Sequence, residues 1–82
     1  ISKLISFEIL FVQQNESMVI VRTLAGRAQG VAYHIDRLNQ PEIMGTVGGD
    51  DTVLIIPSSH VHIPKIVQIV KDLMLNQPPK KE

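Results

Sequence analysis

The spacing of apolar residues changes from a strand period to a helix period twice along this chain, and that change restricts its fold more than any other feature. Residues 5–13 and 18–23 carry the alternating and β-branched patterns typical of strands, and the polar residues 14–17 between them predict an antiparallel hairpin. Residues 25–38 carry apolar side chains at intervals of three and four, which predicts an amphipathic helix. The first half therefore has the order strand, strand, helix.

The second half of the chain repeats that order. Strands are expected at residues 42–47 and 52–57, with a tight turn at residues 48–51 because two glycines there permit positive φ. Residues 58–62 are expected to form a loop, and Pro64, which suits the first turn of a helix, opens a second amphipathic helix. The order β-β-α-β-β-α predicts an α/β protein of the α+β type: a two-layer sandwich with two helices on one face of a four-stranded, mainly antiparallel sheet.

Three further expectations concern packing. Residues 1–76 should form one domain, followed by a disordered tail at residues 77–82. Gly30 lies inside the predicted first helix, where close packing against a neighbouring element would offset the low helix propensity of glycine. An uncovered sheet face that serves as an interface is predicted by the apolar side chains that lack an obvious partner: Leu10, Val12 and Leu54.

Composition narrows the possible functions. The 82 residues include no cysteine, which excludes disulfides and thiolate metal sites, and 44% of them are hydrophobic, which favours assembly with other copies in so small a chain. Eight basic and eight acidic residues give zero net charge, which argues against a nucleic-acid-binding or anionic-membrane surface in this stretch. No apolar run approaches the ~20 residues of a membrane span. The sequence starts at Ile1 rather than at methionine and shows no signal-peptide pattern, so we expect a fragment of a longer cytoplasmic protein.

Asp50 and Asp51 form the sharpest candidate site, because they are adjacent carboxylates on a glycine-rich turn. Carboxylates in this position can hold a guanidinium group by charge-assisted hydrogen bonds, or a hard cation such as Mg²⁺. Aspartate is also a common turn residue, so the spacing alone leaves a purely structural role open. His60 and His62 lack a third metal ligand nearby in the sequence, and a solvated loop is the simpler interpretation of them.

The first predicted helix offers a second candidate site. Gln29 and Asp36 lie seven residues apart, close to two helical turns, so their side chains share one face with Tyr33 near them. That face can present an amide to a carboxylate group and a carboxylate to an amino group. A solvated polar face, with Asp36 beside Arg37, explains the same residues and stays open.

A longer pattern links the two candidates. Residues 45–53 (Gly-Thr-Val-Gly-Gly-Asp-Asp-Thr-Val) resemble a signature of the bacterial arginine repressors, and residues 23–29 (Thr-Leu-Ala-Gly-Arg-Ala-Gln) are similar to the first-helix segment of that family. The resemblance covers residues 5–75 and concerns the C-terminal domain of the family. One departure is Ala25, where many members carry proline, and it affects a turn rather than a ligand.

The resemblance implies an arginine-responsive transcriptional regulator of arginine biosynthesis and catabolism genes, with no enzymatic activity and no metal. Members form trimers that stack into hexamers, and L-arginine binds as co-repressor at the interface between trimers. Operator DNA is bound by a winged helix-turn-helix domain that precedes this one in the family and is absent here. Residue by residue, Gln29 and Asp36 match the family positions that hold the α-carboxylate and α-amino end of arginine. The backbone near Thr46 and Gly48 matches the lining of the pocket. Asp50 and Asp51 match the paired aspartates that hold the charged ends of the ligand.

Two alternative functions stay open. Pterin carbinolamine dehydratases have a similar layout and use clustered histidines, whereas the histidines of this chain are split between the first helix and the loop before the second. The other alternative is a ligand-free multimerisation domain in which the aspartates serve only as turn residues.

Overall fold

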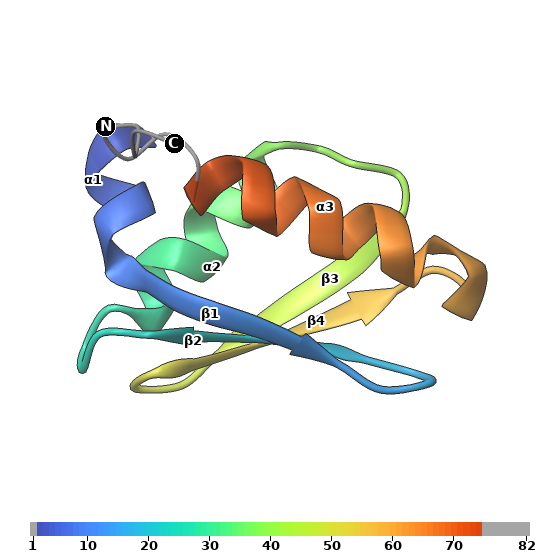
Figure 1. The fold of residues 1–82 in the computed structure, drawn as a ribbon, viewed down its shortest axis with the longest axis horizontal. Coiled ribbons are helices and arrows are strands. Elements are labelled where there is room, and N and C mark those ends of the chain that lie inside the picture. The colour runs from blue at the N-terminus through green and yellow to red at the C-terminus, as the bar shows by residue number, and fades with distance from the viewer. Residues whose placement is uncertain (1, 75–82) are drawn as a thin grey trace, which may run out of the picture.

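The computed structural model describes residues 2–74, in which three α-helices, four β-strands and one 3₁₀ turn follow one another along the chain (Figure 1). Their bounds are α1 Ser2–Glu8, β1 Ile9–Gln14, β2 Val19–Thr23, α2 Ala28–Arg37, β3 Ile43–Gly48, β4 Thr52–Pro57, η1 His60–His62 and α3 Ile63–Met74. The tail predicted at residues 77–82, and the end of the domain predicted at residue 76, lie outside the described residues.

The strands form one antiparallel sheet with the order β1-β2-β4-β3. Helix α2 packs over β3 and β4, and α3 packs over β1 and β2, so both predicted helices cover the same face, as Figure 1 shows. A single cluster of buried aliphatic side chains fills the space between the two layers, including Val21 and Val53 from the sheet and Val31 and Ile66 from the helices. The predicted two-layer α+β sandwich is confirmed.

The prediction of a strand is wrong for residues 5–8, which form the last part of α1. Ile5 and Ile9 lie four residues apart, so a helical segment places both on one side, and both are buried in the core. The short alternation of Phe7 and Ile9 fits a strand equally well in the sequence, and tertiary packing decides between the two. Phe7 points outward and is 52% exposed.

A β-bulge at Leu10 changes which residues of β1 face the helices, because Leu10 is an extra residue between two paired positions. Val12 therefore lies on the core side, opposite the buried Val21, which corrects the prediction that it lies on the uncovered face. Phe11 takes that place instead. Leu54 does lie on the uncovered face, as predicted, because its neighbours along β4 are fully buried on the other side.

The uncovered face of the sheet, called the open sheet face below, carries apolar side chains from all four strands. Its residues are paired across the strands, and none of them reaches the helix layer. The apolar members of the open sheet face are Phe11, Ile20, Val47, Leu54 and Ile56.

Helix α2 is shorter than the 25–38 range predicted for it. It begins at Ala28 because Gly26 adopts a φ of 78°, and the left-handed Asn39, with a φ of 54°, closes its other end. The expected close packing at Gly30 is wrong, since a Cβ built there meets no atom within 4 Å. The loop predicted at residues 58–62 contains the short turn η1.

Candidate functional site

The turn between β3 and β4 lies directly against the first turn of α2. A Cβ on Gly48 would stand 3.1 Å from the Cα of Gln29 and 3.2 Å from the carbonyl oxygen of Ala28, so a side chain there would push the start of α2 away by a few tenths of an ångström. The backbone N–H of Ala28 also donates to the carbonyl oxygen of Asp50 at 3.1 Å. Backbone contacts therefore fix the predicted carboxylate turn to the start of the helix.

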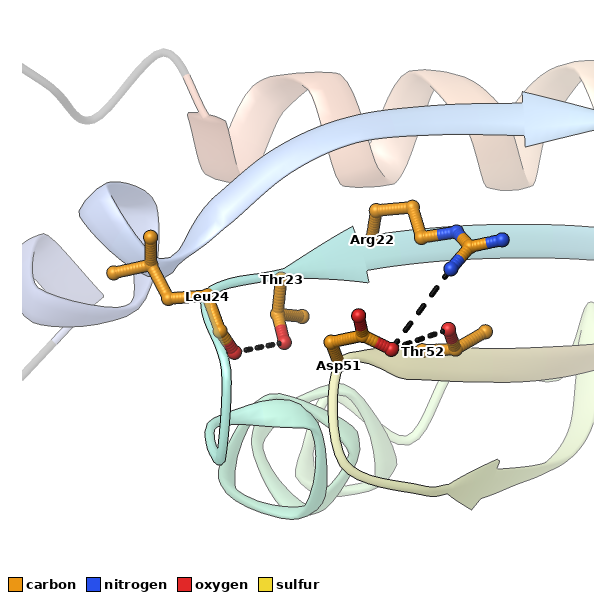
Figure 2. Close-up of polar contacts among 5 residues, drawn as sticks. All are labelled: Arg22, Thr23, Leu24, Asp51 and Thr52. Carbon is orange, nitrogen blue, oxygen red and sulfur yellow. Dashed lines mark hydrogen bonds and ion pairs between the residues drawn. The ribbon is translucent and has the colours of Figure 1, made fainter.

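The backbone of Asp51 is held beside the end of β2, and its carboxylate lies near a cationic side chain of the same protein. The backbone N–H of Thr23 donates to the Asp51 carbonyl oxygen at 2.8 Å. The Oδ1 atom of Asp51 accepts the Thr52 hydroxyl at 3.0 Å, and the Arg22 guanidinium lies 3.8 Å from the same oxygen (Figure 2). The Arg22 and Asp51 side chains are 43% and 53% exposed, so water surrounds the ion pair.

Asp50 differs from its neighbour, although the two are adjacent in sequence. Its side chain is exposed and makes no hydrogen bond or ion pair with any other residue in the described range 2–74. Only its backbone is held, through the bond to α2. The turn therefore presents one unpaired carboxylate and one carboxylate that is partly neutralised.

The polar face of α2 runs along β3. The Thr46 hydroxyl on β3 donates to Oδ1 of Asp36 at 2.8 Å, so this exposed carboxylate has a set orientation. The Arg37 guanidinium donates to the Tyr33 hydroxyl at 3.1 Å and lies 5.6 Å from the centre of that ring. Gln29 is exposed two helical turns earlier, beside the turn.

A hollow of about 330 Å³ opens where α2 ends and β3 begins. Asp36 forms part of its wall, and Asn39 and Gln40 add further polar groups. The apolar part of the wall comes from Ile35 of α2 and from three residues of the loop before β3 and its first positions: Pro41, Ile43 and Met44. The hollow extends the polar surface of α2 beyond Asp36.

The six residues predicted from the sequence lie where α2 meets β3 and the β3–β4 turn, called the α2–β3 seam below, although the Asp51 carboxylate reaches Arg22 and Thr52 on the open sheet face. Gln29 meets Gly48, Asp36 bonds to Thr46, and the turn is fixed to α2 by its backbone. Members of the seam are Gln29, Asp36, Thr46, Gly48, Asp50 and Asp51. Exposed carboxylates at both ends of the seam, with an amide between them, suit a small ligand that carries cationic groups and a carboxylate.

Metal-binding side chains do not gather in this part of the molecule. Within residues 2–74, no group of three or more histidine, cysteine, aspartate or glutamate side chains is placed to hold a metal ion. His60 and His62 lie in η1, at the end of β4 opposite the carboxylate turn. The two aspartates of the turn therefore have no metal-binding partners from the histidines.

Arg22 is the neighbour of the carboxylate turn that the sequence interpretation missed. That interpretation treats residues 18–23 only as an apolar strand, yet Arg22 is the one charged residue of β2. A lone cation in a strand that is otherwise β-branched and apolar was the available signal. Its partner was not visible, because the pairing of β2 with β4 joins residues that are 30 positions apart, as in Arg22 and Thr52.

No helix in the described residues is long and apolar enough to cross a membrane.

The family model for the arginine repressor C-terminal domain matches residues 6–72 of the chain. The chain is 49% identical over 72 residues to an arginine repressor of Chlorobium phaeobacteroides strain DSM 266, covering 88% of the chain and 48% of that protein.

Two further relatives agree with that match. An arginine repressor of Chlorobium phaeobacteroides strain BS1 is 46% identical over 93% of the chain and 51% of that protein, and one of Chloroherpeton thalassium is 47% identical over 88% of the chain and 49% of that protein. The chain spans about half the length of the curated relatives it matches. Because the family model covers most of the chain and the identities are this high, the chain belongs to the arginine repressor C-terminal domain family.

Proposed function

We propose that this chain is the arginine-binding and oligomerising part of an arginine-responsive transcriptional regulator. The observation that carries the proposal is the α2–β3 seam, in which an unpaired carboxylate, an oriented carboxylate and an amide are held on one strip by backbone contacts. L-arginine has a guanidinium, an α-amino group and an α-carboxylate, so it can use all three kinds of group. Membership in the family supports the same ligand.

Each residue of the seam has a distinct role in this proposal. Asp50 and Asp51 hold the charged ends of arginine, partly from a second copy of the chain, by charge-assisted hydrogen bonds. Gln29 and Asp36 bind the α-carboxylate and α-amino end, and the bond from the Thr46 hydroxyl keeps the Asp36 carboxylate in place at 2.8 Å. Gly48 contributes backbone to the pocket, since its lack of a side chain lets α2 approach.

The protein acts as an assembly in this proposal. The open sheet face is apolar and lacks a covering layer in the described residues, and such a face favours contact with other copies. The expected assembly is a trimer, and two trimers join as a hexamer with arginine between them. Sedimentation of the purified protein with and without L-arginine tests this expectation. A monomer at micromolar concentration under both conditions would contradict it.

The domain has a regulatory role and performs no catalysis in this proposal. It works in the cytoplasm and influences operator DNA through a separate DNA-binding domain, so the 82 residues alone should not form a specific operator complex, in line with their zero net charge. Genes of arginine biosynthesis and catabolism are the expected targets.

Calorimetric titration with L-arginine and L-citrulline is the experiment that tests the ligand. Citrulline has nearly the same shape but no charge at the guanidinium end, so it should bind more than tenfold more weakly than arginine, because charged hydrogen bonds are replaced by neutral ones. Heat from arginine at about one ligand per chain is the expected result. A silent titration would favour the ligand-free multimerisation domain, and equal affinity for citrulline would contradict the role of the carboxylates.

A further inference from the structure

A short stretch of chain, residues 23–28, runs from the last residue of β2 to the first residue of α2 and is called the bridge segment below. Both of its ends hold the carboxylate turn of the seam. The N–H of Thr23 donates to the Asp51 carbonyl oxygen at 2.8 Å. The N–H of Ala28 donates to the Asp50 carbonyl oxygen at 3.1 Å. Any movement of the bridge segment therefore moves the turn or breaks these bonds.

The middle of the bridge segment holds the end of α1. The N–H of Leu24, which Figure 2 shows directly after Thr23, donates to the carbonyl oxygen of Glu8 at 2.9 Å. The Arg27 guanidinium binds the side chain of the same residue, with Nε 3.0 Å and Nη2 2.8 Å from Oε2 of Glu8. Glu8 is the last residue of α1, and its side chain is only 14% exposed. The turn and α1 thus share one segment of chain as their support.

The position of Arg27 is not explained by the stability of α2. Arg27 is the N-cap residue of that helix, and its side chain makes no capping hydrogen bond. A cation is unfavourable at a helix N-terminus, because the helix dipole is positive there. The contact with Glu8 offsets this disadvantage and brings a negative charge to the same helix end. Arg27 therefore serves the connection between α1 and α2 rather than α2 itself.

Helix α1 depends on such connections. Its seven residues are too few for a helix that is stable by itself in water. Ile5 and Ser6 are buried, but Phe7 is 52% exposed, so α1 has a small buried surface. Short elements with little buried surface open locally at a lower free energy than the central strands of a sheet. The contacts with Glu8 are therefore well placed to control how firmly α1 is attached.

We infer that the bridge segment couples the seam to α1, and that Glu8 and Arg27 are positioning residues for the ligand site. The inference rests on the proposed function, because it concerns how the same site is held. A ligand that contacts both Gln29 and the aspartates fixes the start of α2 against the turn. The bridge segment then loses freedom, and its two contacts with Glu8 open less often. Because coupling is reciprocal, firm attachment of α1 in turn favours the bound ligand.

The expected size of the coupling follows from the ion pair. Partly exposed pairs correspond to about a two- to fivefold change in an equilibrium constant. Loss of the pair should therefore weaken L-arginine binding by about that factor. By the same reciprocity, saturation with L-arginine should slow amide hydrogen exchange in residues 2–8 of wild type by a similar factor. A variant without the pair should show less slowing.

The test measures both quantities, by calorimetric titration with L-arginine and by hydrogen exchange at saturating and at zero L-arginine, on the purified protein at one concentration. Arg27→Gln and Glu8→Gln remove the ion pair from its two sides. The second variant matters because Arg27 is two residues from Gln29, whereas Glu8 belongs to α1. Lys65→Gln is the matched control, since it removes a pair of similar exposure and length, 59% and 16% exposed at 3.0 Å, from α3. It should change neither quantity.

Each outcome decides the inference. Weaker arginine binding and less slowing of exchange in both Glu8→Gln and Arg27→Gln, with Lys65→Gln like wild type, support it. Weaker binding by Arg27→Gln alone would mean that Arg27 contacts the ligand directly, and it would overturn the coupling. Faster exchange in α1 with unchanged affinity would reduce the pair to a support for the fold, which also overturns it.

Two further results contradict the inference. An equal loss of affinity in Lys65→Gln would trace the effect to general stability, and exchange in residues 2–8 of wild type that ignores bound arginine would remove the coupling itself. In all of these cases wild type still binds arginine, so the proposed function stays intact. No arginine binding by wild type overturns the proposed function, and the inference falls with it.

Discussion

The two ends of β4 each carry an ion pair, and the two pairs are built differently. At the turn end, Arg22 and Asp51 are 3.8 Å apart and about half-exposed. At the other end, the Lys65 ammonium lies 3.0 Å from Oε2 of Glu42, whose side chain is only 16% exposed. The N–H of Ser58 also donates to the carbonyl oxygen of Glu42 at 2.9 Å, which ties the start of β3 to the chain after β4.

The difference separates carboxylates that hold elements together from carboxylates that are left accessible. Glu8 resembles Glu42, because Arg27 contacts it at 2.8 Å and its side chain is 14% exposed. Glu8 and Glu42 join separate elements, and each is largely withdrawn from water. Asp50 and Asp51 stay in water on a turn that the backbone already fixes. The negative charge at the turn is therefore available to a ligand, because its removal should change the free energy of unfolding little.

The largest expected effect is on ligand affinity at the turn end. Asp50→Asn should weaken L-arginine binding by more than tenfold, on the order of 1.5–3 kcal/mol, because a charged hydrogen bond is lost. The free energy of unfolding should change by less than about 0.5 kcal/mol, since the Asp50 side chain makes no hydrogen bond or ion pair with another described residue and asparagine suits a turn. Calorimetry and urea denaturation on the same sample measure both quantities.

Glu42→Gln is the matched control for that variant, with the opposite pattern expected. It removes the same charge at the other end of β4, so it should lower the stability and leave arginine affinity unchanged. If Asp50→Asn destabilised the protein as much as Glu42→Gln does, the contrast between the two ends would be wrong.

The second expected effect is on packing, and it tests whether the backbone alone holds the turn end. Gly48→Ala places a methyl group 3.1 Å from the Gln29 Cα and 3.2 Å from the Ala28 carbonyl oxygen. The start of α2 cannot retreat without straining its bond to the Asp50 carbonyl. We expect a loss of about 1–3 kcal/mol in the free energy of unfolding, together with weaker arginine binding, because Gln29 is displaced. Denaturation and titration of this variant provide the check.

A smaller effect of opposite sign is expected further along the helix. Gly30 lies in α2, and no atom lies within 4 Å of the place that a Cβ would take there, so alanine fits without a clash. Gly30→Ala should stabilise the protein by about 1 kcal/mol, since alanine has the higher helix propensity. Thermal denaturation of the two glycine variants side by side measures the difference. Equal destabilisation by both would mean that the local approach at Gly48 is not what matters.

Most of the fold was predictable because its elements follow the hydrophobic period. Strand β4 occupies the predicted residues 52–57, and β2, β3 and α3 lie within a residue or two of the expected ranges. The errors arose where the same apolar spacing fits both a helix and a strand, or where a bulge inserts an extra residue into a strand. Ile5 and Ile9 suit a helix as well as a strand, and the bulge at Leu10 reverses the inward and outward positions of β1 after it.

The candidate site was also predictable only in part. Helix spacing predicted that Gln29 and Asp36 share a face, and the turn pattern singled out Asp50 and Asp51, but only the family resemblance joined the two groups into one site. The Arg22–Asp51 contact was not predictable, because it depends on the register between β2 and β4. The unequal environments of Asp50 and Asp51 also required coordinates, since nothing in the sequence distinguishes two adjacent aspartates on a turn.

The smallest expected effect is on the stability of the protein at acidic pH. It comes from the ion pair at the end of β4 away from the seam. The hydrogen bond from the Lys65 ammonium, aided by a backbone hydrogen bond and by the positive charges of Lys65 and His62, lowers the pKa of Glu42 below its ordinary value of 4.5. The unfolded chain then binds this proton more tightly than the folded one. The stabilising contribution of Glu42 is therefore complete above pH 4.5 and is lost as the pH falls through the lowered value.

Denaturation midpoints of wild type and Glu42→Gln between about pH 7 and pH 3, at a fixed protein concentration, measure this contribution. Wild type should be the more stable protein at neutral pH, and the gap should narrow as the pH falls, because only wild type has this carboxylate to protonate. Glu16→Gln is the control, since Glu16 is exposed in the turn between β1 and β2, and this variant should be about as stable as wild type at neutral pH. A gap for Glu42→Gln that stayed constant down to the acid limit would mean that Glu42 acts through its shape rather than its charge, and the two ends of β4 would then differ in packing alone.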